Sequence, residues 1–204
     1  MRTRKSLFLV LLTGLCAALV ACGQQPSASV ADQPGGPGMS KDEVEQQDAA
    51  TSWANDYCLA VGSLVDGLAT MPTVDPSTAQ RAVQTSSDLL ASVISGLDKA
   101  VQGLNQLPPS PVPGGDGVRA NAVASFTAVR ARAADAKARL DSARDSTKID
   151  QETLGAAREP LDEVSKLDLL AGFSSIPDLL TASAHAPVCE QLTSEKGQDG
   201  AIPG

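Results

Sequence analysis

Histidine is almost absent from this chain, with His185 as its single representative. One imidazole cannot build a two-histidine metal centre or the carboxylate–histidine di-metal sites of helical bundles. No Cys-x-x-Cys pair is present either. We therefore expect no metal and no other cofactor. His185 lies near the predicted end of a short helix, where we expect it to face solvent or to cap the helix C-terminus.

Motifs of nucleotide-dependent and hydrolytic enzymes are also lacking. The sequence contains no Gly-x-Ser-x-Gly nucleophile elbow. Gly114, Gly115 and Gly117 follow a proline-rich stretch rather than a strand, so they do not match a phosphate-binding loop or a dinucleotide fingerprint. Composition alone leaves a Ser/His/Asp arrangement open, but no motif supports one. The sequence predicts no catalytic residue and a protein that is not an enzyme.

Basic residues are too few to balance the acidic ones. Removal of residues 1–21 takes away three basic side chains and no acidic one, which leaves 13 Lys and Arg against 24 Asp and Glu, a net charge of −11. A surface of this sign repels nucleic acid and anionic lipid headgroups. We therefore expect no nucleic-acid partner and no direct adhesion of the folded part to a membrane.

No hydrophobic run is long enough for a typical transmembrane helix. The apolar stretch at residues 7–20 follows Arg2, Arg4 and Lys5 and is about 14 residues long, against roughly 20 for a membrane span. A positive segment followed by such a stretch is typical of a secretory signal peptide. The alternative is an uncleaved anchor helix followed by a juxtamembrane thiol.

The stretch ends in Leu19-Val20-Ala21-Cys22, which resembles the lipobox of bacterial lipoproteins. The resemblance implies diacylglyceryl transfer to the Cys22 sulfur, cleavage before Cys22 and acylation of the new amino terminus, for example by palmitate. Cys16 follows the bulky Leu15 and fits this pattern poorly. Because two or three acyl chains attach stably to a membrane, we expect a lipid anchor on Cys22 at the extracytoplasmic face of the cell membrane.

The remaining chain divides by composition. After the signal peptide at 1–21, residues 22–39 form the lipidated cysteine and a Pro-, Gly- and Ser-rich linker, whose reach is on the order of 20 to 25 Å. Residues 40–196 are predicted to form one helical domain, long enough to bury a core. Residues 197–204 are polar and rich in glycine, and are expected to be a disordered tail.

Two cysteines, Cys58 and Cys189, remain in the predicted domain. An even pair in an oxidising compartment predicts a disulfide. The bond would close a loop of about 130 residues and stabilise the fold by roughly 4 to 5 kcal/mol on the chain-entropy model. The alternative is two separate buried thiols.

Apolar residues recur at alternating spacings of three and four in four segments, and no segment shows a sustained period of two. This pattern predicts an all-α fold: an up-down four-helix bundle with a fourth helix kinked at Pro160 and a short C-terminal helix attached by the disulfide. The expected helices cover residues 40–71, 75–107, 116–146 and 150–172, with the short one from about 175.

Capping residues and inward faces follow from the same pattern. Ser40 with Glu43 forms a capping box, Met39 with Val44 a hydrophobic staple, and Asp75 and Asp150 are expected N-caps. The inward sets are Val44, Thr51, Ala54, Cys58, Val61, Val65 and Leu68 on the first helix, Val83, Leu90, Val93, Leu97, Ala100, Leu104 and Leu107 on the second, Val118, Ala122, Phe126, Val129, Ala133, Ala136, Leu140 and Ala143 on the third, and Leu154, Ala157, Leu161, Val164 and Leu167 on the fourth.

Basic residues flank the seam of the third helix in two columns. One column consists of Arg130, Lys137 and Arg144, the other of Arg132 and Arg139. An anion-binding stripe is one interpretation. We favour pairing with the acidic residues of the first and fourth helices, because complementary charges beside a seam help to select neighbouring helices.

Gly96 and Gly103 lie seven residues apart in the second helix, where each costs roughly 1 kcal/mol against alanine. One interpretation is close contact between two helix backbones. The other is a small apolar cleft, rimmed by Trp53 and Tyr57, that accepts a lipid or another small apolar ligand.

Residues 53–58 (WANDYC) and the bias toward Ala, Arg and Asp are similar to uncharacterised lipoproteins of high-GC Gram-positive bacteria, a resemblance that implies no activity. We expect a membrane-anchored, non-enzymatic interaction, scaffold or accessory module with an unidentified envelope protein as partner, which predicts a contiguous exposed patch and no sizeable cavity. The alternative is a binding module for a small apolar molecule or lipid, which predicts an enclosed pocket between helices.

Overall fold

The computed structural model describes residues 39–146 and 148–198, and in these ranges it contains helices and loops but no strand. The predicted signal peptide, Cys22 and residues 199–204 lie outside the described residues. Three long helices come first: α1 (Lys41–Ala69), α2 (Ala79–Gln106) and α3 (Gly115–Ala143). Shorter ones follow: α4 (Gln151–Gly155), α5 (Arg158–Ser165), the 3-10 turn η1 (Phe173–Ser175), α6 (Pro177–Ala184) and α7 (Pro187–Gln198). The predicted all-α class is confirmed.

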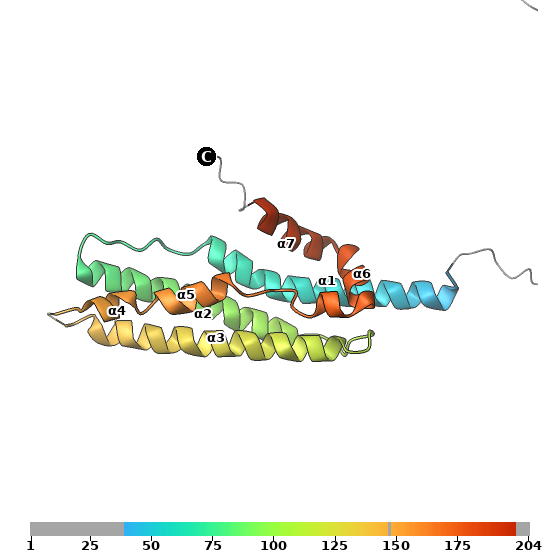
Figure 1. Cartoon of the computed structure of the whole chain (residues 1–204), viewed down its shortest axis with the longest axis horizontal. Helices are drawn as coiled ribbons and strands as arrows, with labels where there is room; N and C mark the ends of the chain where they lie inside the picture. Colours follow the sequence, from blue (N-terminus) through green and yellow to red (C-terminus); the bar gives the residue numbers. More distant parts are fainter. Residues whose placement is uncertain (1–38, 147, 199–204) are drawn as a thin grey trace, which may run out of the picture. The chain divides into compact units, whose positions relative to one another are not determined.

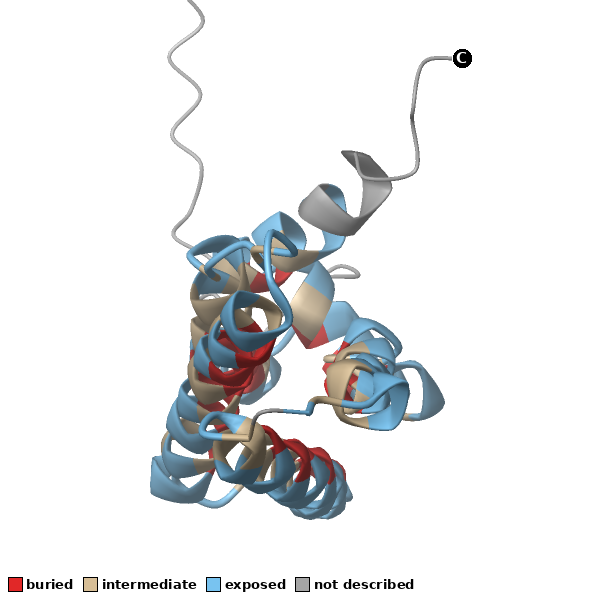
Figure 2. Cartoon of the chain, turned by 90° about the vertical axis from the view of Figure 1, so that its left-hand side faces the viewer, coloured by how far each residue is buried: buried red, intermediate tan, exposed pale blue. Residues whose placement is uncertain are grey.

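The long helices run up and down, with α2 packed between α1 and α3 (Figure 1). The chain then returns along α3 as α4 and α5, and η1 leads into α6, which packs against α1. The last helix, α7, also packs on α1. Short helices therefore take the place of one long fourth helix. This agrees with the predicted kinked fourth helix and with the predicted C-terminal helix attached by the disulfide. An end-on view shows the buried residues gathered on the faces that the helices turn toward one another (Figure 2).

The start of α1 follows the predicted capping box. The Glu43 backbone N–H donates to Ser40 Oγ at 3.3 Å, and the Ser40 N–H donates to Glu43 Oε2 at 2.7 Å. Met39 and Val44 are 56% and 43% exposed, so they do not form the buried contact that the predicted staple requires. The cap, rather than packing, defines this helix terminus.

The start of α2 differs from the prediction. Thr78 is the N-cap and accepts from the Arg81 N–H, whereas Asp75 accepts from the Ser77 N–H inside the preceding loop. Asp75 closes a local turn around Pro76, and a second capping side chain then follows three residues later. The predicted cap at Asp75 was therefore wrong by one turn. The seam of α2 is confirmed, because its predicted inward residues are buried except for the half-buried Leu107.

The seam of α3 is also confirmed, with only Ala143 of the predicted set half-buried. The helix begins at Gly115, beside the predicted Asp116, and ends at Ala143 rather than Ser146. Its basic columns pair differently from the prediction. Arg130 bonds to Asp98 at 2.6 Å, and Arg144 lies 3.4 Å from Asp88. Both carboxylates belong to α2, because α2 and not α1 is the neighbour of α3.

The other charged contacts of α3 agree in part with the prediction. Arg132 pairs with Glu163 of α5, as expected for the fourth helix. Lys137 instead bonds to Asp141 within α3 at 2.6 Å. The same Asp141 accepts from the buried hydroxyl of Ser87 at 2.6 Å, which joins α3 to α2. Most residues of the two basic columns thus form ion pairs with neighbouring helices.

The fourth segment is more broken than predicted. Asp150 caps α4 as expected and accepts from Thr153 N–H at 2.7 Å. The break falls at residues 156–157, which puts Pro160 in the first turn of α5, where a missing N–H leaves no helical bond unmade. The helix ends at Ser165, not at Gly172, whose φ of +89° begins η1. The predicted single C-terminal helix is likewise two helices, α6 and α7, with Pro187 at the start of the second.

The seam of α1 was only partly predicted. Ala54, Cys58 and Val61 are buried as expected, but Val44 is exposed and Thr51, Val65 and Leu68 are half-buried. The buried residues that the prediction omitted are Ala50, Trp53, Tyr57, Ala60 and Leu64. Helix α1 contacts both α2 and the C-terminal helices, so its buried face is wider than one seam.

The predicted disulfide is confirmed. Cys58 and Cys189 are bonded with a Cα–Cα distance of 5.2 Å, across a sequence separation of 131. The exposed fractions of the two residues are 0% and 1%. Beside the bond, the Val188 N–H donates to the Asn55 side chain at 3.2 Å. The bond therefore fixes the start of α7 to the middle of α1.

Replacement of both cysteines by alanine is expected to lower the free energy of unfolding by about 4 kcal/mol, because the unfolded chain regains the conformations that the large loop forbids. Urea denaturation of the double variant measures this. The wild type unfolded under reducing conditions is the matched control and should lose a similar amount. An unchanged midpoint in both samples would contradict the role given to this bond.

Candidate functional site

The residues of the predicted cleft lie in two separately packed places. Trp53, at 3% exposure, and Tyr57, at 0%, form an aromatic cluster with Phe173 of η1. Their ring centroids lie 5.7 Å (Trp53–Tyr57), 6.5 Å (Trp53–Phe173) and 4.8 Å (Tyr57–Phe173) apart. The indole N–H of Trp53 donates to the Pro108 carbonyl at 3.1 Å. These rings join α1 to the C-terminal segment rather than rim an open cleft.

The two glycines pack against α1 further along the helix, at Ala60 and Leu64, on the face that also carries Trp53 and Tyr57. A Cβ on Gly103 would lie 2.8 Å from the Ala60 Cβ, and one on Gly96 would lie 3.1 Å from Leu64 Cδ1. Gly67 of α1 in turn approaches the Gly96 backbone. Close contact between the backbones of α1 and α2, the first of the two interpretations, accounts for both glycines.

Gly103→Ala is expected to destabilise the protein by about 1 to 3 kcal/mol, because the new methyl group overpacks this contact by more than alanine gains in helix propensity. Thermal unfolding followed by circular dichroism measures the change. Gly155→Ala is the matched control, since a Cβ at Gly155 meets no atom within 4 Å. Equal effects of the two substitutions would contradict the close approach.

The Tyr57 hydroxyl is buried and has no hydrogen-bond partner among the described residues. Burial in this apolar cluster, with a smaller contribution from the negative charge of Asp168, raises the pKa of Tyr57 well above its usual range. The folded protein thus keeps this phenol protonated at alkaline pH. Aromatic packing, rather than the hydroxyl, is the contribution of Tyr57 to the fold.

Tyr57→Phe is expected to raise the free energy of unfolding by about 1 kcal/mol near neutral pH, because it removes an unsatisfied buried group. The wild type should lose further stability above about pH 10, where the unfolded tyrosine ionises and the folded one does not; the variant should lack this loss. Urea denaturation at neutral and alkaline pH compares the two. Since Tyr57 is the single tyrosine, tyrosinate absorbance in the native wild type at that pH would contradict the shift.

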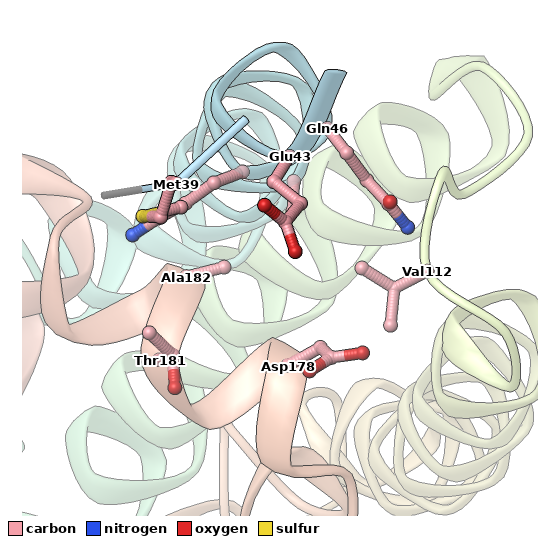
Figure 3. Close-up of a pocket in the computed structure, with 9 residues that line it drawn as sticks. Met39, Glu43, Gln46, Val112, Asp178, Thr181 and Ala182 are labelled. Carbon is pink, nitrogen blue, oxygen red and sulfur yellow. The ribbon is translucent and has the colours of Figure 1, made fainter. Parts of the chain in front are cut away.

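A groove of about 260 Å³ opens where α1 begins, between α1, the α2–α3 loop and α6 (Figure 3). Its lining residues are Met39, Glu43, Gln46, Gln47, Ala50, Val112, Asp178, Thr181 and Ala182. Sequence patterns did not indicate this groove. Its residues come from three segments far apart in the chain. Of these segments, only the start of α1, with its acidic residues, is conspicuous in the sequence.

The groove has an apolar floor and a polar rim. Ala50, Val112 and Ala182 are 5%, 3% and 1% exposed, so they form a floor of small side chains continuous with the core. Carboxylates stand on both sides of it, Glu43 from α1 and Asp178 from the first turn of α6 (Figure 3). The groove can accept an apolar group that also carries positive charge or hydrogen-bond donors.

Hydrogen bonds hold the loop that supplies Val112. Ser110 Oγ accepts from the Val112 N–H at 3.1 Å, and Asp116 accepts from the Ser110 N–H at 3.1 Å. Arg119 donates to the Leu107 carbonyl at 2.7 Å. Together with the bond from Trp53 to this loop, these contacts form the wall before any ligand arrives, which lowers the entropic cost of binding.

The first turns of α1 extend past the core. Residues 41–49 are exposed except for the half-buried Gln47, and burial begins at Ala50. Helices normally gain most of their stability from packing of an apolar face, so the capping box carries unusual weight here. The carboxylates of Asp42, Glu43, Glu45 and Asp48 lie in these turns. Their negative charge near a helix N-terminus is favourable.

Glu43 of the rim is held in its charged form at neutral pH. Hydrogen bonds from the backbone and then the side chain of Ser40 hold the pKa of Glu43 below its usual range.

In the described part of the chain, no group of three His, Cys, Asp or Glu residues is arranged to hold a metal ion. His185 is exposed and is the C-cap of α6, in line with the prediction for it.

No helix among residues 39–146 and 148–198 is both long and apolar enough to cross a bilayer. Comparison with protein-family models, curated proteins and solved structures finds no match for this chain. The groove, the tether and the charge of the folded part are therefore the observations from which a function is inferred.

Proposed function

We propose that this chain is a lipid-anchored lipoprotein of the extracytoplasmic membrane face, and that its helical domain is a non-enzymatic interaction or accessory module. A partner protein docks in the groove between α1 and α6. The observation that carries this proposal is the position of the groove at the beginning of α1, directly after the linker that leads from Cys22.

The tether supports a function close to the membrane. Residues 23–39 give a reach on the order of 20 to 25 Å, and the groove lining starts at Met39. A partner seated there stays within that reach of the lipidated cysteine. Anchoring also confines both proteins to one surface, which raises their effective concentration. A module that works by holding a partner gains from this arrangement without any new contact.

The shape of the groove favours a protein segment over a small apolar molecule. Small-molecule sites are usually concave pockets of about 300 to 1,000 Å³ that enclose most of the ligand. This groove is open to solvent and below that range at about 260 Å³, so it suits one or two side chains of a longer segment. The exposed turns of α1 beside it offer the additional surface that such a segment needs.

The proposal predicts that a photo-crosslinking amino acid at position 46 captures a discrete protein partner in intact cells. Gln46 lies in the groove lining, whereas the exposed Gln102 of α2 does not and serves as the matched control. We expect an adduct from position 46 and none from position 102. Both proteins should fractionate with the membrane.

Cys22→Ala in the same cells removes the lipid anchor, and we expect the protein to leave the detergent phase of a phase-partition assay and the adduct to weaken strongly. Cys16→Ala should change neither result. Partition of the wild type into the aqueous phase with an unmodified amino terminus, or adducts of equal yield from positions 46 and 102, would overturn the proposal.

A further inference from the structure

We infer that the occupant of the groove is a cationic amphipathic segment of another envelope protein. An apolar side chain of this segment lies on Ala50, Val112 and Ala182, and a Lys or Arg side chain lies between Glu43 and Asp178. The inference rests on the proposed function and names the chemistry of its partner.

Charge complementarity selects this partner. Among the described residues, Glu43 and Asp178 are the charged residues of the groove lining, and none of those that line it is basic. Along the exposed turns of α1, Lys41 is the one basic residue, and it already lies 3.6 Å from Glu45. The remaining carboxylates favour a partner of positive charge. Complementary charge raises the association rate of such a partner and fixes its alignment in the groove.

The apolar floor selects an amphipathic partner rather than a merely basic one. Ala50, Val112 and Ala182 are small, so they leave room above them for a larger aliphatic or aromatic side chain. An apolar anchor in a preformed pocket, surrounded by polar contacts, is the usual arrangement of an interface hot spot. The exposed turns of α1 extend this surface along the axis of a helix, as in the recognition of amphipathic helices by grooves.

The same charges exclude three other occupants. A second copy of this chain would bring equal acidic surfaces together in a symmetric contact, and anionic lipid headgroups would be repelled. The linker at residues 23–38 carries Asp32 and no basic residue, so it does not complement the rim. A cationic segment of a different protein is the occupant that both the rim and the floor favour.

Synthetic peptides test the inference on the full mature chain bearing Cys22→Ala, which removes the lipid and leaves the described residues unchanged. The probe is a fluorescent amphipathic peptide of Leu and Lys, about 15 residues long so that it can form a helix. Two matched peptides replace every Lys by Glu or every Leu by Ser. Fluorescence anisotropy at low and high salt measures the dissociation constants.

We expect the Leu/Lys peptide to bind at least about tenfold more tightly than either matched peptide. Gln46→Trp, which fills the groove from α1, should weaken binding by about tenfold or more, and Gln102→Trp should not change it. Thr181→Trp fills the groove from α6 and repeats the test if Gln46→Trp lowers the helical content. Asp178→Asn should weaken binding by about threefold, an effect that high salt abolishes, whereas Asp135→Asn on α3 should have no effect.

Several results would overturn the inference. Equal weakening by Gln46→Trp and Gln102→Trp would mean that the peptide binds the acidic surface as a whole. Tighter binding of the Leu/Glu peptide, self-association of the chain abolished by Gln46→Trp, or binding to phosphatidylglycerol vesicles abolished by the same substitution would each identify a different occupant. None of these results affects the anchoring and crosslinking tests of the proposed function, so the two failures are distinguishable.

Discussion

The attachment of the C-terminal segment to the middle of α1 is the constraint on which the rest of this structure depends. The Cys58–Cys189 bond and the cluster of Trp53, Tyr57 and Phe173 lie on neighbouring turns of α1. At this level α1 packs on α6 and α7 as well as on α2. Helices α6 and α7 are short, and neither would be stable alone in water. Because α6 supplies one wall of the groove, the groove also depends on this attachment, although none of its lining residues belongs to the disulfide or to the cluster.

Helix α1 is held to α2 and to the C-terminal segment by different physical means. Toward α2, the glycines at 67, 96 and 103 let the backbones approach closely, so many weak dispersion contacts act over a long interface. Toward the C-terminal segment, a few large rings and one covalent bond act at a single level of the helix. The contact with α2 is therefore sensitive to added side-chain volume, and the contact with the C-terminal segment is sensitive to loss of a side chain. Helix α3 differs from both, since its alanine-rich seam is supplemented by charged contacts to α2 and α5.

Sequence patterns predicted the parts of the fold that depend on one dominant neighbour. The seams of α2 and α3 follow a single period and were identified almost completely, and the cysteine pair followed from the compartment that the signal peptide indicates. In α1, Trp53 and Tyr57 were missed because Phe173, on which they pack, lies more than a hundred residues away in the chain. Ala60 and Leu64, which face α2, were missed because the predicted seam ran along a different line of the helix. At Asp75, two equivalent capping residues compete, and local sequence does not rank them. The groove joins α1, Val112 and α6, and no single segment shows it before folding.

Trp53 is an intrinsic fluorescent reporter of the part of the fold that surrounds it. It is the single tryptophan of the chain, and it lies where α1, the Pro108 carbonyl, Gly115 of α3 and Phe173 of η1 meet. Its emission therefore senses the docking of three separate segments at once, without any dye. The indole binds the loop that also supplies Val112 to the groove. A change in its emission spectrum on mixing with another molecule would therefore report binding in the groove as well as the integrity of the fold.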